Sequence, residues 1–232
     1  MSRSSSEVTE VLHCRTSAPT GSRTPISGSR IRRASLCTMG AEEFLDQVTF
    51  VDVGAYTGDS LRRYVQMGGW VRHAHLFEPN PDLRIKRDFG CPVTIYRKAA
   101  WTSSGYRPFY ISRLYAAAGS TLLPEKNTGD IDLDNPIQVE CINFPAWLSQ
   151  LDDRPLVLKV NAEGTEYKLT NGLARAGVLS NLSVIYMSLH AEKLGLPASA
   201  DIALTSLLEG NGFRPHPSKV YSPVYCETWI AT

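Results

Sequence analysis

Residues 51–60 read Val51-Asp52-Val53-Gly54-Ala55-Tyr56-Thr57-Gly58-Asp59-Ser60 and connect an apolar run to a helical pattern. The run at 49–53 is rich in β-branched residues and stops at Gly54, which predicts a buried parallel strand. Apolar side chains then recur at helical spacing from Leu61 until Gly68-Gly69, which predicts a helix. A strand, a glycine-containing turn and a helix together form the first unit of an α/β fold.

The same alternation continues along most of the chain. Further strands are predicted at 74–78, 93–96, 156–160, 182–189 and 225–231, and further helices at 81–90, 144–151, 165–176 and 202–209. This order indicates a mostly parallel sheet that is covered on both faces. Two alternating segments, 107–111 and 137–142, enclose a long stretch rich in Gly, Asp, Asn and Pro. They predict a hairpin-like insertion with a flexible tip.

Composition limits the class of protein. The chain has 232 residues, of which 43% are hydrophobic and 20% are charged, as is typical of a soluble globular protein. No apolar run approaches the roughly 20 residues of a membrane-spanning helix. The net charge of +1 gives no general reason to bind nucleic acid or an anionic membrane. Five cysteines without a C-x-x-C pair disfavour a zinc site or a disulfide framework, and they fit a cytoplasmic protein.

Residues 1–38 differ from the rest of the chain. They contain six arginines, no lysine and two acids, with few apolar residues. This composition predicts a disordered basic leader that is rich in Ser and Arg, followed by one folded domain over 39–232. Two alternatives stay open, namely an organelle-targeting segment and a natural start at Met39.

The turn at 54–58 is the first candidate for a ligand site, because ligands of such sheets bind beyond the carboxyl ends of the strands. Gly54 permits a sharp turn, and Gly58 would let a ligand approach the start of the helix. A dinucleotide motif G-x-G-x-x-G that begins at Gly54 would need glycine at positions 56 and 59. Tyr56 and Asp59 stand there instead, which disfavours NAD and FAD.

Glu78 ends the next predicted strand. A carboxylate at this position can accept hydrogen bonds from both ribose hydroxyls of an adenosine. Together with Asp52 and the Gly54–Gly58 spacing, Glu78 suits an adenosine ligand without a pyrophosphate, such as S-adenosylmethionine. The alternative is a tight turn and a solvated strand end with no ligand.

Residues 50–60 resemble the first motif of class I S-adenosylmethionine-dependent methyltransferases, and further blocks resemble the FkbM family of that group. These blocks are Phe77-Glu78-Pro79-Asn80-Pro81, Lys98-Ala99-Ala100-Trp101, Gly119-Ser120-Thr121-Leu122, Lys159-Val160-Asn161-Ala162-Glu163-Gly164-Thr165-Glu166 and Leu189-His190-Ala191-Glu192-Lys193-Leu194-Gly195. They occur in family order over about residues 48–231.

The resemblance implies a Rossmann-like doubly wound sheet of about seven strands with an antiparallel last strand. It also implies O-methylation of a hydroxyl on a small acceptor, such as a sugar or another metabolite. Neither a nucleic acid nor a membrane is expected as a partner. The residues expected to bind the cofactor are Asp52, Gly54, Tyr56, Thr57, Gly58, Glu78, Asn80, Ala100, Trp101 and Asn161.

Two positions depart from the family pattern. Asn161 stands where the family usually has Asp, and Ser188 stands where it often has Glu. Each change removes a negative charge from the expected active face. A catalytically degenerate protein that binds S-adenosylmethionine or a nucleotide without transferring a methyl group therefore stays open as an alternative function.

The expected catalytic residues are His190, Glu163 and Asn161. His190 ends a predicted strand and is the candidate general base, because an imidazole accepts protons near neutral pH. Its alternative role is that of a histidine hydrogen-bonded within the core. Glu163 is expected to orient His190 or bind the acceptor, and Asn161 to hold the methionine end of the cofactor or the acceptor hydroxyl.

Other polar residues are assigned structural roles. Lys159 is expected to form a structural ion pair, and His73 and His75 to be structural. No metal site is expected, because the acids at 130, 132 and 134 lack the glycine and glutamate that a calcium loop needs. The stretch Gly119-Ser120-Thr121 is a candidate lid over the acceptor.

Overall fold

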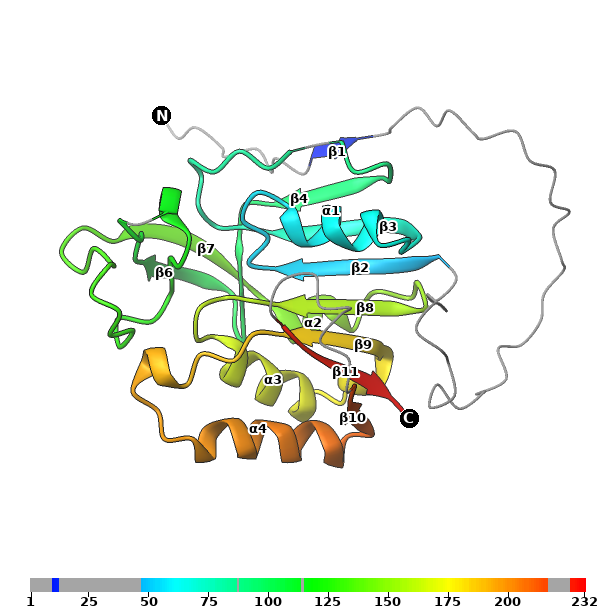
Figure 1. The fold of residues 1–232 in the computed structure, drawn as a ribbon. Helices are drawn as coiled ribbons and strands as arrows, with labels where there is room; N and C mark the ends of the chain where they lie inside the picture. Colours follow the sequence, from blue (N-terminus) through cyan, green and yellow to red (C-terminus); the bar gives the residue numbers. More distant parts are fainter. Residues whose placement is uncertain (1–9, 13–46, 87, 114, 217–225) are drawn as a thin grey trace, which may run out of the picture.

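A computed structural model describes residues 10–12, 47–86, 88–113, 115–216 and 226–232 of the chain (Figure 1). Its main sheet has eight strands in the order β1-β4-β3-β2-β8-β9-β11-β10. Their bounds are β1 Glu10–Leu12, β2 Val48–Val53, β3 Val71–Phe77, β4 Val93–Tyr96, β8 Leu156–Val160, β9 Leu182–Met187, β10 Phe213–Pro215 and β11 Glu227–Ala231.

The central strands β4, β3, β2, β8 and β9 run parallel to one another. The last strand of the chain, β11, is antiparallel to both β9 and β10. The predicted Rossmann-like sheet, mostly parallel with an antiparallel last strand, is therefore confirmed. The buried strands follow from the sequence because most of their residues on both faces are apolar. All six residues of β2 are buried, for example, including the polar Thr49 and Asp52.

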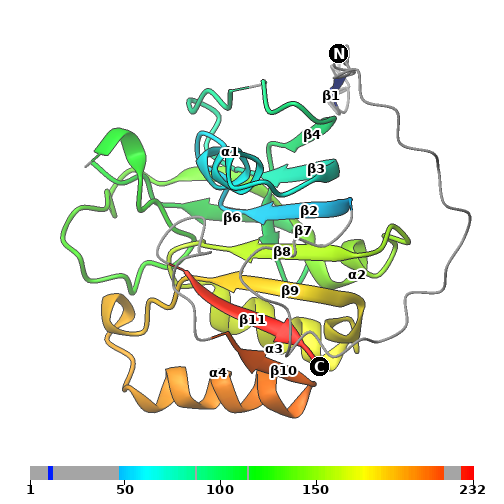
Figure 2. The same cartoon turned by 45° about the vertical axis from the view of Figure 1, so that its right-hand side comes forward.

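Helices cover both faces of the sheet (Figures 1 and 2). Helix α1 (Asp59–Gln66) packs on one face, where Leu61 and Tyr64 join a core with Phe50 and Leu76. Helices α2 (Phe144–Leu148), α3 (Glu166–Arg175) and α4 (Ser199–Gly210) pack on the other face. No helix of the described ranges has both the length and the apolar character needed to cross a membrane.

The predicted hairpin-like insertion is confirmed and belongs to a second sheet. Strands β6 (Gly105–Phe109) and β7 (Ile137–Asn143) pair antiparallel. A short strand that was not predicted, β5 (Ala99–Trp101), pairs parallel with β7. A short helical turn, η2 (Tyr115–Ala117), lies between β6 and β7. In Figure 1 the arrowheads of β2 and β8 point toward this insertion, so it lies at the carboxyl ends of the central strands.

The prediction of a helix over 81–90 is wrong. Residues 81 and 82 form a turn, and no helix follows in the described residues up to 90. The backbone groups of this segment have partners outside it. The Asp82 N–H donates to Asn80 Oδ1, and the Lys86 N–H donates to the carbonyl of Thr57. Arg97 donates to the carbonyl of Leu83, so the hydrogen bonds of a helix are replaced by bonds to neighbouring segments.

Smaller differences concern the ends of elements and the leader. Helix α2 ends at Leu148, and β9 ends at Met187, each earlier than expected. Strand β10 was not predicted because it has only three residues. Three residues of the expected leader, Glu10–Leu12, form β1 beside β4. The other residues of segment 1–38 lie outside the described ranges, so the expectation of disorder stays a prediction there.

Candidate functional site

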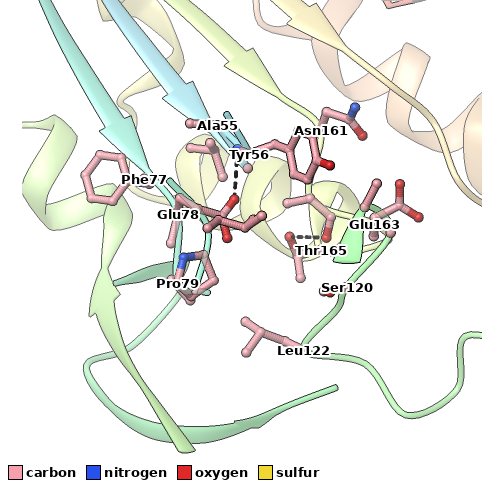
Figure 3. Close-up of a pocket in the computed structure, with 18 of the residues that line it drawn as sticks. Ala55, Tyr56, Phe77, Glu78, Pro79, Ser120, Leu122, Asn161, Glu163 and Thr165 are labelled. Carbon is pink, nitrogen blue, oxygen red and sulfur yellow. Dashed lines mark hydrogen bonds between the residues drawn. The ribbon is translucent and has the colours of Figure 1, made fainter. Parts of the chain in front are cut away.

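A pocket of about 230 Å³ opens where the carboxyl ends of β2, β3 and β8 meet the insertion (Figure 3). Most of its wall comes from four segments that are far apart in the sequence, with further residues from α1, β5 and the loop after β3. The four segments are the turn after β2 (Gly54, Ala55, Tyr56), the end of β3 (Phe77, Glu78, Pro79), the turn after β8 (Asn161, Ala162, Glu163) and the insertion (Phe109, Ala117, Ala118, Gly119, Ser120, Leu122). This is the edge at which parallel α/β sheets bind ligands.

Gly54 lets the two central strands come together beneath the pocket. Its φ is +73°, and a Cβ atom there would lie 2.0 Å from the carbonyl oxygen of Asn161. The Asn161 N–H donates to the carbonyl of Val53 at 3.0 Å. Any larger residue at position 54 would push these two turns apart, which explains why the predicted turn needs glycine here.

Gly58 has a different local role from the one expected. A Cβ atom on Gly58 would lie 2.4 Å from Cζ of the Phe89 ring. The space in which a ligand was expected to approach this glycine is therefore filled by Phe89. The neighbouring Thr57 hydrogen-bonds to Asp59 through its hydroxyl and receives the N–H of Lys86 on its carbonyl. Asp59, at the start of α1, lines the pocket.

Glu78 presents a carboxylate to the pocket and is only 6% exposed. Its Oε2 accepts the Tyr56 N–H at 2.9 Å (Figure 3), and its Oε1 accepts the Asn80 N–H at 2.9 Å. Burial raises the pKa of Glu78, and these two donors oppose that rise. Each carboxylate oxygen keeps a further lone pair, so Glu78 can accept two more hydrogen bonds from a ligand.

Asp52 supports the pocket from below. The carboxylate is fully buried, and its Oδ1 lies 2.8 Å from Nζ of Lys159. Lys159 also donates to the carbonyl of Gly54 at 2.7 Å. Lys159 thus forms the structural ion pair expected of it and connects Asp52 to the turn. Asp52 itself is absent from the pocket wall, whereas Lys159 is part of it.

Of the remaining residues expected to bind the cofactor, one lines the pocket and two do not. Ala100 lines the pocket. Asn80 lies behind Glu78 and is 2% exposed; its carbonyl accepts a hydrogen bond from Arg97. Trp101 is buried next to Ala100, but its ring faces the cations of Arg107 and Lys168 instead of the pocket. Asn80 therefore positions Glu78, and Trp101 belongs to the insertion core.

Asn161 contributes a polar atom whose hydrogen-bonding capacity is unused. Its Oδ1 is buried and has no hydrogen-bond partner among the described residues. The residue lines the pocket. A buried oxygen without a donor costs free energy, so a donor supplied by a ligand would be favourable here.

Glu163 lies at the centre of a charged cluster that connects three loops. Its Oε2 is 3.0 Å from Nζ of Lys126 and 3.0 Å from Nζ of Lys193, and its Oε1 is 3.5 Å from Nε2 of His190. Burial alone would raise the pKa of Glu163, but His190 and the two lysines together lower it. Glu163 is therefore held as a carboxylate at the pocket wall.

His190 stands behind Glu163 and does not line the pocket. Its Nδ1 is 3.0 Å from Oε1 of Glu166, which is fully buried. Glu166 also accepts the backbone N–H groups of Ala162 and Gly164. Chemical reasoning from the sequence assigned no role to Glu166. The sequence feature that could have identified Glu166 is its place as the second glutamate of the block Lys159–Glu166, at the start of a predicted helix.

The insertion covers the pocket and is connected to the other loops. Its Thr121 hydroxyl donates to the carbonyl of Glu163 at 2.8 Å, and Lys126 donates to the carbonyl of Gly119. The Tyr56 hydroxyl donates to the carbonyl of Ala116 at 3.4 Å. The candidate lid 119–121 thus lies over the pocket, and its movement stays a prediction.

Residues with unusual backbone conformations are concentrated around the pocket. In the described ranges, the non-glycine residues with positive φ are Tyr56, Ala116, Ala117 and Glu163. Three of them line the pocket, and the carbonyl of Ala116 accepts the Tyr56 hydroxyl. Such conformations cost about 1–3 kcal/mol each and are concentrated at functional sites.

The acids of the insertion serve local structure. Asp132 accepts the N–H groups of Asp134 and Asn135 and pairs with Arg113. Asp130 accepts the hydroxyls of Ser112 and Thr128. Among the described residues, no group of three or more His, Cys, Asp or Glu side chains is placed to hold a metal ion.

A comparison with protein families identifies the class of this pocket. The family model of the methyltransferase FkbM domain matches residues 52–215. The chain belongs to the FkbM methyltransferase family. The matched region begins in β2 and ends in β10, so it includes every segment that lines the pocket. Neither the curated proteins nor the solved structures that were compared contain a match to this FkbM methyltransferase.

Proposed function

We propose that this FkbM methyltransferase binds S-adenosylmethionine in the pocket and methylates a hydroxyl of a small acceptor, such as a sugar or another metabolite. The observation that carries the proposal is the Glu78 carboxylate. It is buried at the pocket wall, is held by the N–H groups of Tyr56 and Asn80, and keeps lone pairs for ribose hydroxyls.

The other pocket residues fit the same cofactor. The unpartnered Oδ1 of Asn161 suits the ammonium group at the methionine end. Phe77, Ala100 and Leu83 supply apolar surface near Glu78 for a flat heterocycle. Glu78 and Asp59 place negative charge around a ligand that carries a positive charge on sulfur, whereas the charge of Glu163 is balanced by Lys126 and Lys193.

S-adenosylmethionine supplies an activated methyl group when it is bound. The chain must then align the acceptor, exclude water and receive the hydroxyl proton. Phe109, Leu122 and residues 117–120 of the insertion cover the pocket and exclude water. Glu163 is the carboxylate that a hydroxyl in the pocket meets first, and His190 lies behind it. Glu163 therefore orients the acceptor hydroxyl and accepts its proton as the methyl group is transferred. Nε2 of His190, 3.5 Å from Oε1 of Glu163, can then take this proton, and Glu166 holds the other side of the His190 ring.

Calorimetric titration with S-adenosylmethionine tests the binding half of the proposal. We expect Glu78→Ala to weaken binding by about 100-fold or more, because a buried charged acceptor of two hydrogen bonds is lost. Glu140→Ala is the matched control, because Glu140 is a half-exposed acid outside the pocket wall that pairs with Lys98. Unchanged affinity in a folded Glu78→Ala protein would refute the assignment of Glu78.

The second candidate function is binding without transfer, which Asn161 favours because it removes a carboxylate from the pocket. Ser188, the other departure from the family pattern, lies outside the pocket wall and contacts Sγ of Cys226 at 3.0 Å. A radiolabelled methyl assay over a panel of hydroxylated acceptors separates the two functions. Transfer to any acceptor supports the enzyme, whereas tight cofactor binding with no transfer over the whole panel supports the binding protein.

A further inference from the structure

We propose that a second cavity, on the outer side of α3, binds the phosphate-type oxyanion of a small molecule. This groove has a volume of about 700 Å³ and shares no lining residue with the cofactor pocket. It is lined by Thr102, Asn143, Pro145, Tyr167, Lys168, Asn171, Gly172, Arg175 and Ala176. It is thus bordered by the beginning of the insertion, by α2 and by the exposed face of α3.

The charged side chains that line the groove are all cationic. Lys168 and Arg175 lie one above the other on α3, and no carboxylate is among the lining residues. Neither cation is within ion-pair distance of an acid in the described part of the chain. The nearest acid with a contact to the lining, Asp201, already accepts the hydroxyl of Tyr167 at 2.6 Å.

A buried indole, that of Trp101, contacts Lys168 of the groove lining and also Arg107, which lies outside that lining. The guanidinium carbon of Arg107, from β6, lies 4.7 Å from the Trp101 ring, and Nζ of Lys168, from α3, lies 5.2 Å from it. Cation–π contacts fix these side chains without neutralising their charge. Lys168 therefore keeps its positive charge at the groove, and an anion bound there would offset this charge together with that of Arg175.

The segments that border the groove determine its shape and also supply its hydrogen-bond donors. A Cβ atom on Gly172 would lie 3.0 Å from Cγ2 of Thr102 and 3.2 Å from Cγ of Pro145, so α3 packs directly against the floor. Asn143 uses its Oδ1 to accept the Ala146 N–H, which leaves its amide N–H groups for a ligand. The ammonium of Lys168, the guanidinium of Arg175 and the amide of Asn143 together suit a tetrahedral oxyanion with several acceptors.

Calorimetric titration of the full chain with inorganic phosphate and with glucose 6-phosphate, without S-adenosylmethionine, tests this site. We expect saturable binding with a dissociation constant on the order of 1 mM for at least one probe. Lys168→Gln and Arg175→Gln should each weaken it by about fivefold or more. Arg63→Gln is the matched control, because Arg63 and Arg175 are both basic residues in the last turn of a helix, and it should stay within about twofold of the wild type.

Tighter binding of glucose 6-phosphate than of phosphate would identify a phosphorylated small molecule as the ligand, and equal binding would identify the free anion. Both results support the site. The absence of saturable heat up to about 20 mM of either probe would overturn it. An equal loss in Arg63→Gln and Arg175→Gln would also overturn it, since the binding would then follow overall charge. Because no cofactor is added, these results do not depend on the proposed methyl transfer.

Discussion

Asn161 lies in the pocket and is the position at which the sequence analysis expects a departure from the family pattern. Its buried Oδ1 has no hydrogen-bond partner among the described residues, and Lys159, two residues earlier, is paired with Asp52. The Asn161 side chain therefore still offers an acceptor oxygen to a ligand, but it lacks the negative charge of the Asp that the sequence analysis expects at this position.

We expect Asn161→Ala to weaken S-adenosylmethionine binding by about tenfold, because one hydrogen bond to a charged donor is lost. Asn161→Asp should bind at least as tightly as the wild type, because it restores a charged acceptor at the same place. Calorimetry on both variants measures this. Tighter binding by the alanine variant than by the wild type would contradict a contact between Asn161 and the cofactor.

His75, which lies outside the pocket, contributes to the stability of the fold. Its ring stacks on His73 at 4.6 Å, and its Nδ1 lies 3.1 Å from the hydroxyl of Tyr96. Burial and the neighbouring His73 lower the pKa of His75 to about 4, against a weaker opposing effect of Asp153. In the unfolded chain the pKa returns to the ordinary value near 6.5.

Because the unfolded chain binds the proton more readily, the contribution of His75 is complete above about pH 6.5 and is lost as the pH falls toward 4. We expect the wild type to lose on the order of 2 kcal/mol more stability between pH 7.5 and 4.5 than His75→Phe does. Urea unfolding at the two pH values measures the difference. Equal losses in both proteins would show that His75 is not buried in its neutral form.

At the scale of elements, a buried cation helps to attach the insertion to the rest of the domain. Lys126 is 4% exposed and joins the carbonyl of Gly119 to the carboxylate of Glu163. The insertion is thereby attached to the turn after β8, and the Thr121–Glu163 hydrogen bond supports the same connection. Breaking a buried ion pair on one side typically costs about 3 kcal/mol.

We expect Lys126→Met to lower the hydrogen-exchange protection of residues 117–123 while β2 and β8 keep theirs. Lys98→Met is the matched control, because Lys98 forms a more exposed pair with Glu140. Addition of S-adenosylmethionine should raise protection of the same segment in the wild type, if it acts as the lid. Unchanged exchange of residues 117–123 in Lys126→Met would contradict a role for Lys126 in holding the insertion.

Elements with strong local patterns could be predicted, and those determined by tertiary contacts could not. The buried strands and α3 follow from apolar periodicity, and Glu78 follows from its place at the end of a strand. The segment 81–90 has a helical pattern, but its backbone bonds to Thr57 and Arg97 instead. Phe89 fills the space beside Gly58, a contact between two segments that no local pattern reveals.

The charged cluster around Glu163 shows the same limit on what the sequence alone can predict. Glu163 and His190 could be named as candidates from the family blocks, but their order around the pocket could not. The structure places Glu163 at the wall and His190 behind it, with Glu166 and Lys126 as further partners. Lys126 lies in an insertion without periodicity, so nothing in its local sequence pointed to the pocket.

At the scale of the whole molecule, the parallel sheet brings the turns after β2, β3 and β8 to one edge, and the insertion closes that edge. The pocket exists only because these four segments meet, and the family match covers all of them. The proposed function therefore depends on the complete fold of residues 47–216, and on Glu78 as its central polar contact.

A crystal structure of the protein with S-adenosylhomocysteine tests this account most directly. We predict that the two ribose hydroxyls donate to the Glu78 carboxylate and that the amino group lies within hydrogen-bonding distance of Asn161 Oδ1. A ligand bound elsewhere, or bound in the pocket with Glu78 out of contact with the ribose, would contradict the account.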